Sequence, residues 1–126
     1  MKTRHFRDLI VWQRSMKLAG VVYAATKAFP QEEMFGLTSQ LRRAAVSVPS
    51  NIAEGHGRLT DNGFAVFLGQ ARGSLFEVET QIEMASTLGY IKAVEAKKMI
   101  AECDEVVKML NGLLKTLKEK ETKLAP

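Results

Sequence analysis

The sequence is poor in the residues that mark several classes of protein. Its only cysteine is Cys103, so no disulfide bond can form within the chain. None of its three prolines lies between Pro49 and Pro126, which leaves long stretches free to form helix. No run of about 18 apolar residues is present, and membrane-spanning segments need one. We therefore expect neither a fold stabilised by internal disulfide bonds nor a transmembrane fold.

The N-terminus is basic but lacks the apolar core of a signal peptide. Four polar side chains interrupt its hydrophobic part: Asp8, Gln13, Arg14 and Lys17. A signal peptide needs an uninterrupted apolar segment at this place. We therefore expect a cytoplasmic protein with no membrane contact.

Metal-binding and catalytic patterns are also missing. The two histidines, His5 and His56, have no histidine or cysteine three or four residues away, and no Glu-x-x-His pair exists. No histidine lies within helical reach of Ser47, Ser50 or Ser74 to activate a serine nucleophile. We expect no metal, no cofactor and no enzymatic activity.

What the sequence does contain is typical of a helical globular protein with a basic beginning. Hydrophobic residues make up 46% and charged residues 25% of its 126 residues, which suits one globular domain. The net charge is +4, and residues 1–30 carry six lysines and arginines against one aspartate. This basic first part predicts attraction to a polyanion or an acidic partner, and a purely solubilising function remains open.

Period-3.6 patterns predict four helices, at about 7–28, from 33 or 37 to 57, 61–88 and 92–120. Phe29-Pro30 ends the first, and Thr60 is a typical N-cap for the third. Gly55 and Gly57 suit a left-handed end for the second. Short connections predict an all-α, antiparallel up-and-down four-helix bundle over residues 1–126, with its second helix kinked at Pro49 and a frayed tail at 121–126.

Two of the predicted helices have more apolar surface than a single bundle buries. The last helix has one stripe, which includes Cys103 as a buried small hydrophobe. The first and third helices each have two apolar stripes. The second stripe of the third helix contains Val66, Gly69, Gly73, Phe76, Thr80 and Met84. The glycine pair indicates close approach by another helix, either the second helix or a neighbouring subunit. We expect a homo-oligomer that covers the surplus stripes.

The second helix carries an unusual polar stripe between Gln40 and Arg58. It contains short hydroxyls, an amide and opposite charges, and its spacing predicts a Glu54–Arg58 ion pair. Glu77 of the third helix is placed to receive an arginine. We expect a structural polar network of Gln40, Ser47, Asn51, Glu54, Ser74 and Glu77. A phosphate or ligand site that uses Arg42, Arg43 or Arg58 is the alternative.

Several motifs also resemble a known family. They are LIVWQ at 9–13, EMFGLTSQLRRAA at 33–45, SVPSNIAEG at 47–55 and ARGSL at 71–75. Over residues of about 6 to 115, the chain resembles a bacterial four-helix-bundle family whose genes lie in intervening sequences of large-subunit ribosomal RNA genes. A relative, the accessory variability determinant protein of diversity-generating retroelements, forms a five-subunit barrel that binds nucleic acid and a reverse transcriptase.

The resemblance implies a homopentamer that is not an enzyme and that associates with RNA or DNA. The candidate nucleic-acid-binding residues are Arg4, Arg7, Arg14, Lys17, Arg42, Arg43 and Arg58. Aromatic residues do not interleave with these basic ones as a stacking platform for single-stranded nucleic acid would need, so binding through phosphate, weakened by salt, is expected. The alternative is a protein-interaction scaffold that binds a partner such as a polymerase without contacting nucleic acid.

Overall fold

Four long helices form the described part of the protein, residues 5–124 of a computed structural model. They are α1 (Ile10–Thr26), α2 (Leu37–His56), α3 (Asp61–Thr87) and α4 (Ala93–Leu124), with short 3-10 helices at Phe6–Asp8 (η1) and Gln31–Glu33 (η2). These residues contain no strand. The predicted all-helical four-helix fold is confirmed.

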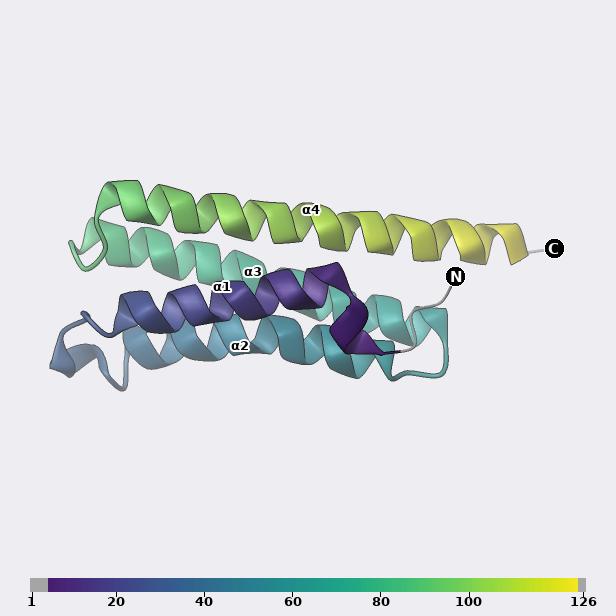
Figure 1. Ribbon diagram of the computed structural model, residues 1–126, viewed down its shortest axis with the longest axis horizontal. Helices are drawn as coiled ribbons and strands as arrows, with labels where there is room; N and C mark the ends of the chain where they lie inside the picture. Colours follow the sequence, from purple (N-terminus) through teal and green to yellow (C-terminus); the bar gives the residue numbers. More distant parts are fainter. Residues whose placement is uncertain (1–4, 125–126) are drawn as a thin grey trace.

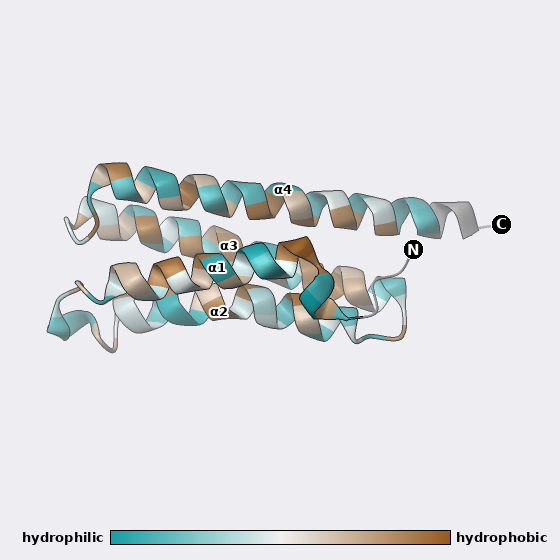
Figure 2. Ribbon diagram, in the orientation of Figure 1, coloured by the Kyte–Doolittle hydropathy of each residue, from teal (hydrophilic) through white to brown (hydrophobic). Residues whose placement is uncertain are grey.

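The helices are arranged as a bundle in which each has two neighbours. The chain reverses its direction at every connection, so η1 and the end of α4 lie at the same end of the bundle (Figure 1). The most extensive contact joins α2 and α3, and the pairs α3–α4, α1–α2 and α1–α4 complete the ring. Polar and apolar residues alternate along every helix (Figure 2). No helix within residues 5–124 has an apolar stretch long enough to cross a lipid bilayer.

The helix ends differ in detail from the predictions. The first helix starts at Ile10 rather than Arg7, because Leu9 is extended (φ −73°, ψ 124°) and separates η1 from α1. The start of α3 is as predicted, since the Thr60 hydroxyl accepts a hydrogen bond from the Gly63 amide at 3.0 Å. The last helix continues past Lys120 to Leu124, and residues 125–126 of the tail predicted to fray lie outside the described residues.

The predicted left-handed glycine at the end of α2 is wrong. Gly57 has φ −77°, and Gly55 is a buried residue inside the helix. Within residues 5–124, only Gly89 has a positive φ, 80°, at the connection from α3 to α4. A Cβ added at Gly55 would lie 2.6 Å from the Cβ of Phe67, so this glycine permits the close approach of α3. Pro49 lies inside α2, which continues on both sides of it, and the bend there stays a prediction.

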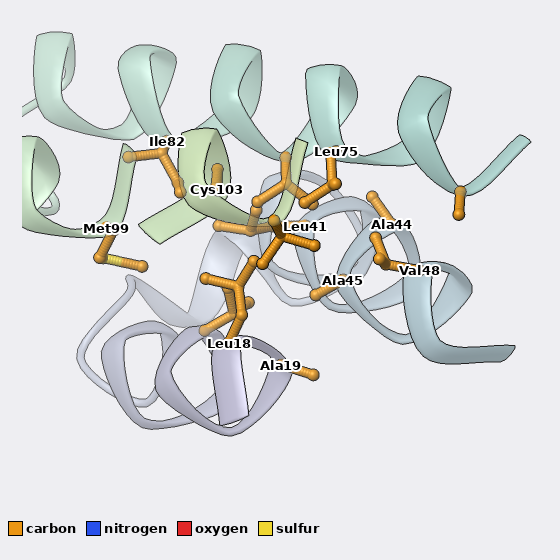
Figure 3. Packing of buried hydrophobic residues seen from close by; sticks show 14 of the residues in the cluster. Leu18, Ala19, Leu41, Ala44, Ala45, Val48, Leu75, Ile82, Met99 and Cys103 are labelled. Atoms are coloured by element: carbon orange, nitrogen blue, oxygen red, sulfur yellow. The ribbon is translucent and has the colours of Figure 1, made fainter. Parts of the chain in front are cut away.

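The core lies along the bundle axis and takes side chains from all four helices. Figure 3 shows Leu18 of α1, Leu41 of α2, Ile82 of α3 and Cys103 of α4 meeting in this space. Leu41, Ile82 and Cys103 have no exposed surface, and each fully buried large apolar side chain contributes about 1.5–3 kcal/mol. Burial raises the pKa of the Cys103 thiol to about 12, with further contributions from Glu79 and Asp104. Cys103 is therefore a packing residue, as predicted.

The pH dependence of stability should report on Glu79, which lies between α3 and α4. Burial, the neighbouring carboxyl of Asp104 and the charge of Glu83 together raise the pKa of Glu79 to about 7. A raised carboxyl pKa means that the folded protein holds the proton more tightly than the unfolded chain. Its contribution to stability is therefore complete below the unfolded value of 4.5 and is lost as the pH rises through 7.

We expect the free energy of unfolding to fall by about 1 kcal/mol between about pH 5 and about pH 8, a figure discounted for solvent screening. Glu79→Gln should remove most of this fall, and Glu119→Gln on the exposed face of α4 should leave it unchanged. Urea unfolding of the original protein and of the two variants, at both pH values, measures these changes in the free energy of unfolding. An unaltered pH dependence in Glu79→Gln would contradict the assignment.

Candidate functional site

An open polar groove runs between α2 and α3 and has a volume of about 440 Å³. We call it the α2–α3 groove. Its lining residues come from both helices and are Gln40, Arg43, Ala44, Ser47, Ser74, Glu77 and Gln81. The structure thus brings four of the six predicted network residues, together with Arg43, to one place.

The floor of the groove is a chain of short hydrogen bonds. The hydroxyls of Ser47 and Ser74 share a hydrogen bond of 2.9 Å across the two helices. The Asn51 amide donates to the backbone carbonyl of Ser47 at 2.8 Å and to its hydroxyl at 2.9 Å. Ser74 is only 8% exposed, so these bonds satisfy groups that burial would otherwise leave unpaired. The bond between Ser47 and Ser74 also joins α2 to α3.

The charged groups of the α2–α3 groove have no partner within residues 5–124. The expected ion pair between Glu77 and an arginine does not form there, and Arg43 makes neither an ion pair nor a side-chain hydrogen bond. The Oε1 atom of Gln81 is buried and also lacks a hydrogen-bond partner. The groove therefore offers the Arg43 guanidinium, the Glu77 carboxylate and the amides of Gln40 and Gln81 to another molecule.

Glu54, a fifth network candidate, lies apart from the groove. Its carboxylate pairs with Arg58 at 3.7 Å, at the spacing predicted from the sequence. The two side chains are 59% and 49% exposed, so the pair adds little stability. The Arg58 guanidinium also lies 4.4 Å from the ring centre of Phe67. This pair belongs to the end of α2 rather than to the α2–α3 groove.

Four arginines lie over aromatic rings, two of them over rings close in the sequence and two over rings on another helix. Arg42 lies 4.7 Å from the ring centre of Tyr23, and its Nε donates to the Thr26 hydroxyl at 2.7 Å. Three further arginines stack in the same way, and their pairs are Arg7–Phe6, Arg58–Phe67 and Arg72–Phe76. The inference from linear order is wrong: the pairs of Arg7 and Arg72 are local in the sequence, and helix packing creates the pairs of Arg42 and Arg58.

The remaining basic candidates are spread over the N-terminal part. Arg14 forms an ion pair with Glu102 of α4 at 3.1 Å, and Lys17 is exposed on α1. Arg7 in η1 contacts the Nε2 atom of His5 at 3.0 Å. Arg4 lies outside the described residues. The three pairs made by Arg14, Arg42 and Arg58 show that these side chains also connect elements of the bundle.

Gln81 is a groove residue that the sequence reasoning missed. It lies four residues after Glu77 and seven after Ser74, so it shares their face of α3. Extending the polar stripe of α3 by one turn would have identified it. The ring beneath Arg42 had no comparable signal, since Tyr23 and Arg42 are 19 positions apart, whereas Phe76 follows Arg72 at the spacing of one helical turn.

The second apolar stripe of α3 faces outward, and we call it the α3 outer strip. Val66 is 53%, Phe76 46% and Met84 51% exposed. A Cβ added at Gly69 or Gly73 would meet nothing within 4 Å. The glycines are therefore not explained by close approach of α2, which uses Gly55 instead. On α1, the large apolar side chains of Met16 and Tyr23 are likewise 47% and 43% exposed.

These features define a four-helix bundle with a polar interhelical groove and an uncovered apolar strip. The family model of the 23S rRNA-intervening sequence protein matches residues 7–112, and the chain belongs to this family. The resemblance drawn from the motifs is thus confirmed at the level of the family.

A solved structure shares the fold. It is the crystal structure of a protein with unknown function from the S23 ribosomal protein family of Bacteroides thetaiotaomicron, with a TM-score of 0.76 and 21% identity. The match covers 84% of this chain and 99% of that one. Comparison with curated proteins gave no match.

Proposed function

We propose that this protein is a non-enzymatic, oligomeric accessory protein of the cytoplasm that binds RNA or DNA through phosphate groups. The observation that carries the proposal is the set of arginines stacked on aromatic rings. Stacking uses the flat face of a guanidinium and leaves N–H groups at its edge for phosphate oxygens. Arg42 is held in this way by Tyr23 and by a hydrogen bond from its Nε atom, so its terminal amino groups remain available.

Charge supports the same proposal. Residues 1–30 have the largest positive excess of the chain, and Lys17 lies exposed on α1. Arg43 adds a guanidinium without a partner among the described residues, at the mouth of the α2–α3 groove. Repetition of these cations in an oligomer would raise avidity without new contacts. The α3 outer strip supports the oligomer, because a second copy would remove its apolar surface from water.

The non-enzymatic part of the proposal rests on the chemistry of the groove. Its serines hydrogen-bond to each other and to Asn51, and none of these groups is a base that activates a nucleophile. The described residues also hold no cluster of three histidine, cysteine or acidic side chains suited to a metal ion. We infer an architectural function for these hydrogen bonds.

Salt dependence tests the binding proposal directly. We expect the protein to retain RNA or DNA on a filter at about 50 mM salt and to bind at least tenfold more weakly at about 200 mM, because released counterions drive phosphate binding. Arg42→Gln should weaken binding and reduce the slope with salt, whereas Lys115→Gln on α4 should not. Absence of retention at the lower salt concentration for both nucleic acids would end the proposal.

A protein-interaction scaffold is the second candidate. It is favoured by the α2–α3 groove, where Arg43 and Glu77 offer opposite charges instead of the single sign that a polyanion prefers. Such a groove suits a partner protein, for example a polymerase. Recovery of the same partner before and after nuclease treatment would favour the scaffold, and loss of every partner on treatment would favour nucleic-acid binding.

A further inference from the structure

A second cavity lies at the end of the bundle, where α2 ends and α3 begins. We call it the end cavity. Its volume is about 510 Å³, within the range of small-molecule sites, and it shares no residue with the α2–α3 groove. All four helices border it directly or through the turns that adjoin them. Leu9 precedes α1, His56 ends α2, Phe64 lies in the second turn of α3, and Leu117 lies on α4.

The end cavity has an apolar wall that α4 completes. Leu9, Phe64, Leu113 and Leu117 line it, and each is only partly buried by the rest of the chain. The His56 ring stands edge-on to Phe64, with ring centres 5.8 Å apart. The family match ends at residue 112, so Leu113 and Leu117 lie in the part of α4 beyond it. The apolar wall thus depends on a segment outside the matched family region.

Two cationic side chains border the end cavity, and each has one carboxylate partner. Arg58 and Lys120 line it with a single carboxylate, Asp61, whose Oδ2 lies 3.3 Å from the Lys120 Nζ. The 27-residue helix α3 also begins at Asp61, and the start of a helix carries partial positive charge. Arg58 also pairs with Glu54, which lies outside the lining, at 3.7 Å. Both ion pairs are solvent-exposed and therefore weak, so a bound anion would compete with them for the two cations.

We propose that the end cavity binds an amphipathic anion, with an apolar chain between Phe64 and the leucines and one carboxylate or phosphate at Lys120 and Arg58. The apolar wall and the cationic rim select such a ligand together. An uncharged chain would make no charge-assisted hydrogen bond to Lys120 or Arg58, and a small inorganic anion would leave the apolar wall in contact with water. The site shares Arg58 with the proposed nucleic-acid binding, whereas Lys120 and the leucines belong to the cavity alone, so variants at Lys120 and Leu117 test it separately.

Calorimetric titration with octanoate, octyl phosphate and 1-octanol tests the assignment. We expect octanoate or octyl phosphate to bind at one molecule per chain, and the tighter of the two identifies the head group. Octanol should bind at least tenfold more weakly. Lys120→Glu should weaken binding of the anion about tenfold or more, since it reverses the charge at the rim.

Two further variants separate binding from folding. Leu117→Asn should weaken binding of the anion about tenfold, because it removes apolar surface from the cavity wall. The helical content should stay unchanged, because Leu117 is only partly buried in the fold. Lys115→Glu makes the same charge change as Lys120→Glu on the same helix, outside the cavity lining, and should leave binding unaltered. No saturable binding, equal binding of octanol, or equal weakening by the two lysine variants would overturn the proposal.

Discussion

Replacing Gly69 and Gly73 together by alanine should stabilise the folded chain and at the same time weaken its self-association. Alanine is favoured over glycine inside a helix by about 1 kcal/mol at each position. The added methyl groups meet nothing within 4 Å in the single chain, so the fold should gain this stability without strain. A second copy packed closely on the α3 outer strip would collide with them. We expect association to weaken at least tenfold while the protomer becomes more stable.

Gly112→Ala is the matched control for this pair. Gly112 lies on the exposed side of α4, and its added Cβ would also meet nothing within 4 Å. This variant should gain helix stability and leave association unchanged. Sedimentation equilibrium measures association, and urea unfolding measures stability. If the double alanine variant associates as tightly as the original protein, the α3 outer strip is not the contact between copies.

Gly55→Ala should destabilise the fold by about 3 kcal/mol despite the better helix propensity of alanine. The new Cβ would lie 2.6 Å from the Cβ of Phe67 and 3.3 Å from the carbonyl oxygen of Phe64. Neither atom is the end of a flexible side chain, so the backbones of α2 and α3 would have to separate. That separation would also stretch the bond between Ser47 and Ser74, which joins the same two helices.

Gly57→Ala is the control for Gly55→Ala. Gly57 follows α2 with a right-handed φ of −77°, and the nearest atom to an added Cβ is the Glu54 carbonyl oxygen at 3.5 Å, an ordinary contact. The Gly57→Ala substitution should therefore change the free energy of unfolding by less than about 1 kcal/mol. Urea unfolding of the two variants provides the comparison. A Gly55→Ala protein as stable as the original would show that α2 and α3 do not depend on this close approach.

Much of the fold follows from local patterns. The 3.6-residue period places Leu18, Leu41, Ile82 and Cys103 in the core, and the N-cap at Thr60 starts α3 as expected. Gly55 shows where local reasoning fails. A glycine near a helix end suits a left-handed cap and a close helix crossing equally well. Only the position of Phe67 on the neighbouring helix decides between them.

The candidate site was predictable where its residues share a helix face. Gln40, Arg43 and Ser47 follow one stripe of α2, and Ser74, Glu77 and Gln81 follow one stripe of α3. The partners across helices were not predictable, because they depend on the rotation of each helix about its axis. That rotation places the Arg42 guanidinium over the ring of Tyr23, and it leaves Glu77 without an ion pair to an arginine among the described residues.

The central proposal is that other copies of the chain cover the α3 outer strip. Light scattering on the eluting peak of a gel-filtration column tests it most directly. One chain weighs 14.0 kDa. We predict a single assembled species, at about 70 kDa if five chains of 14.0 kDa associate. A mass of 14.0 kDa at every concentration up to about 100 µM would contradict the account.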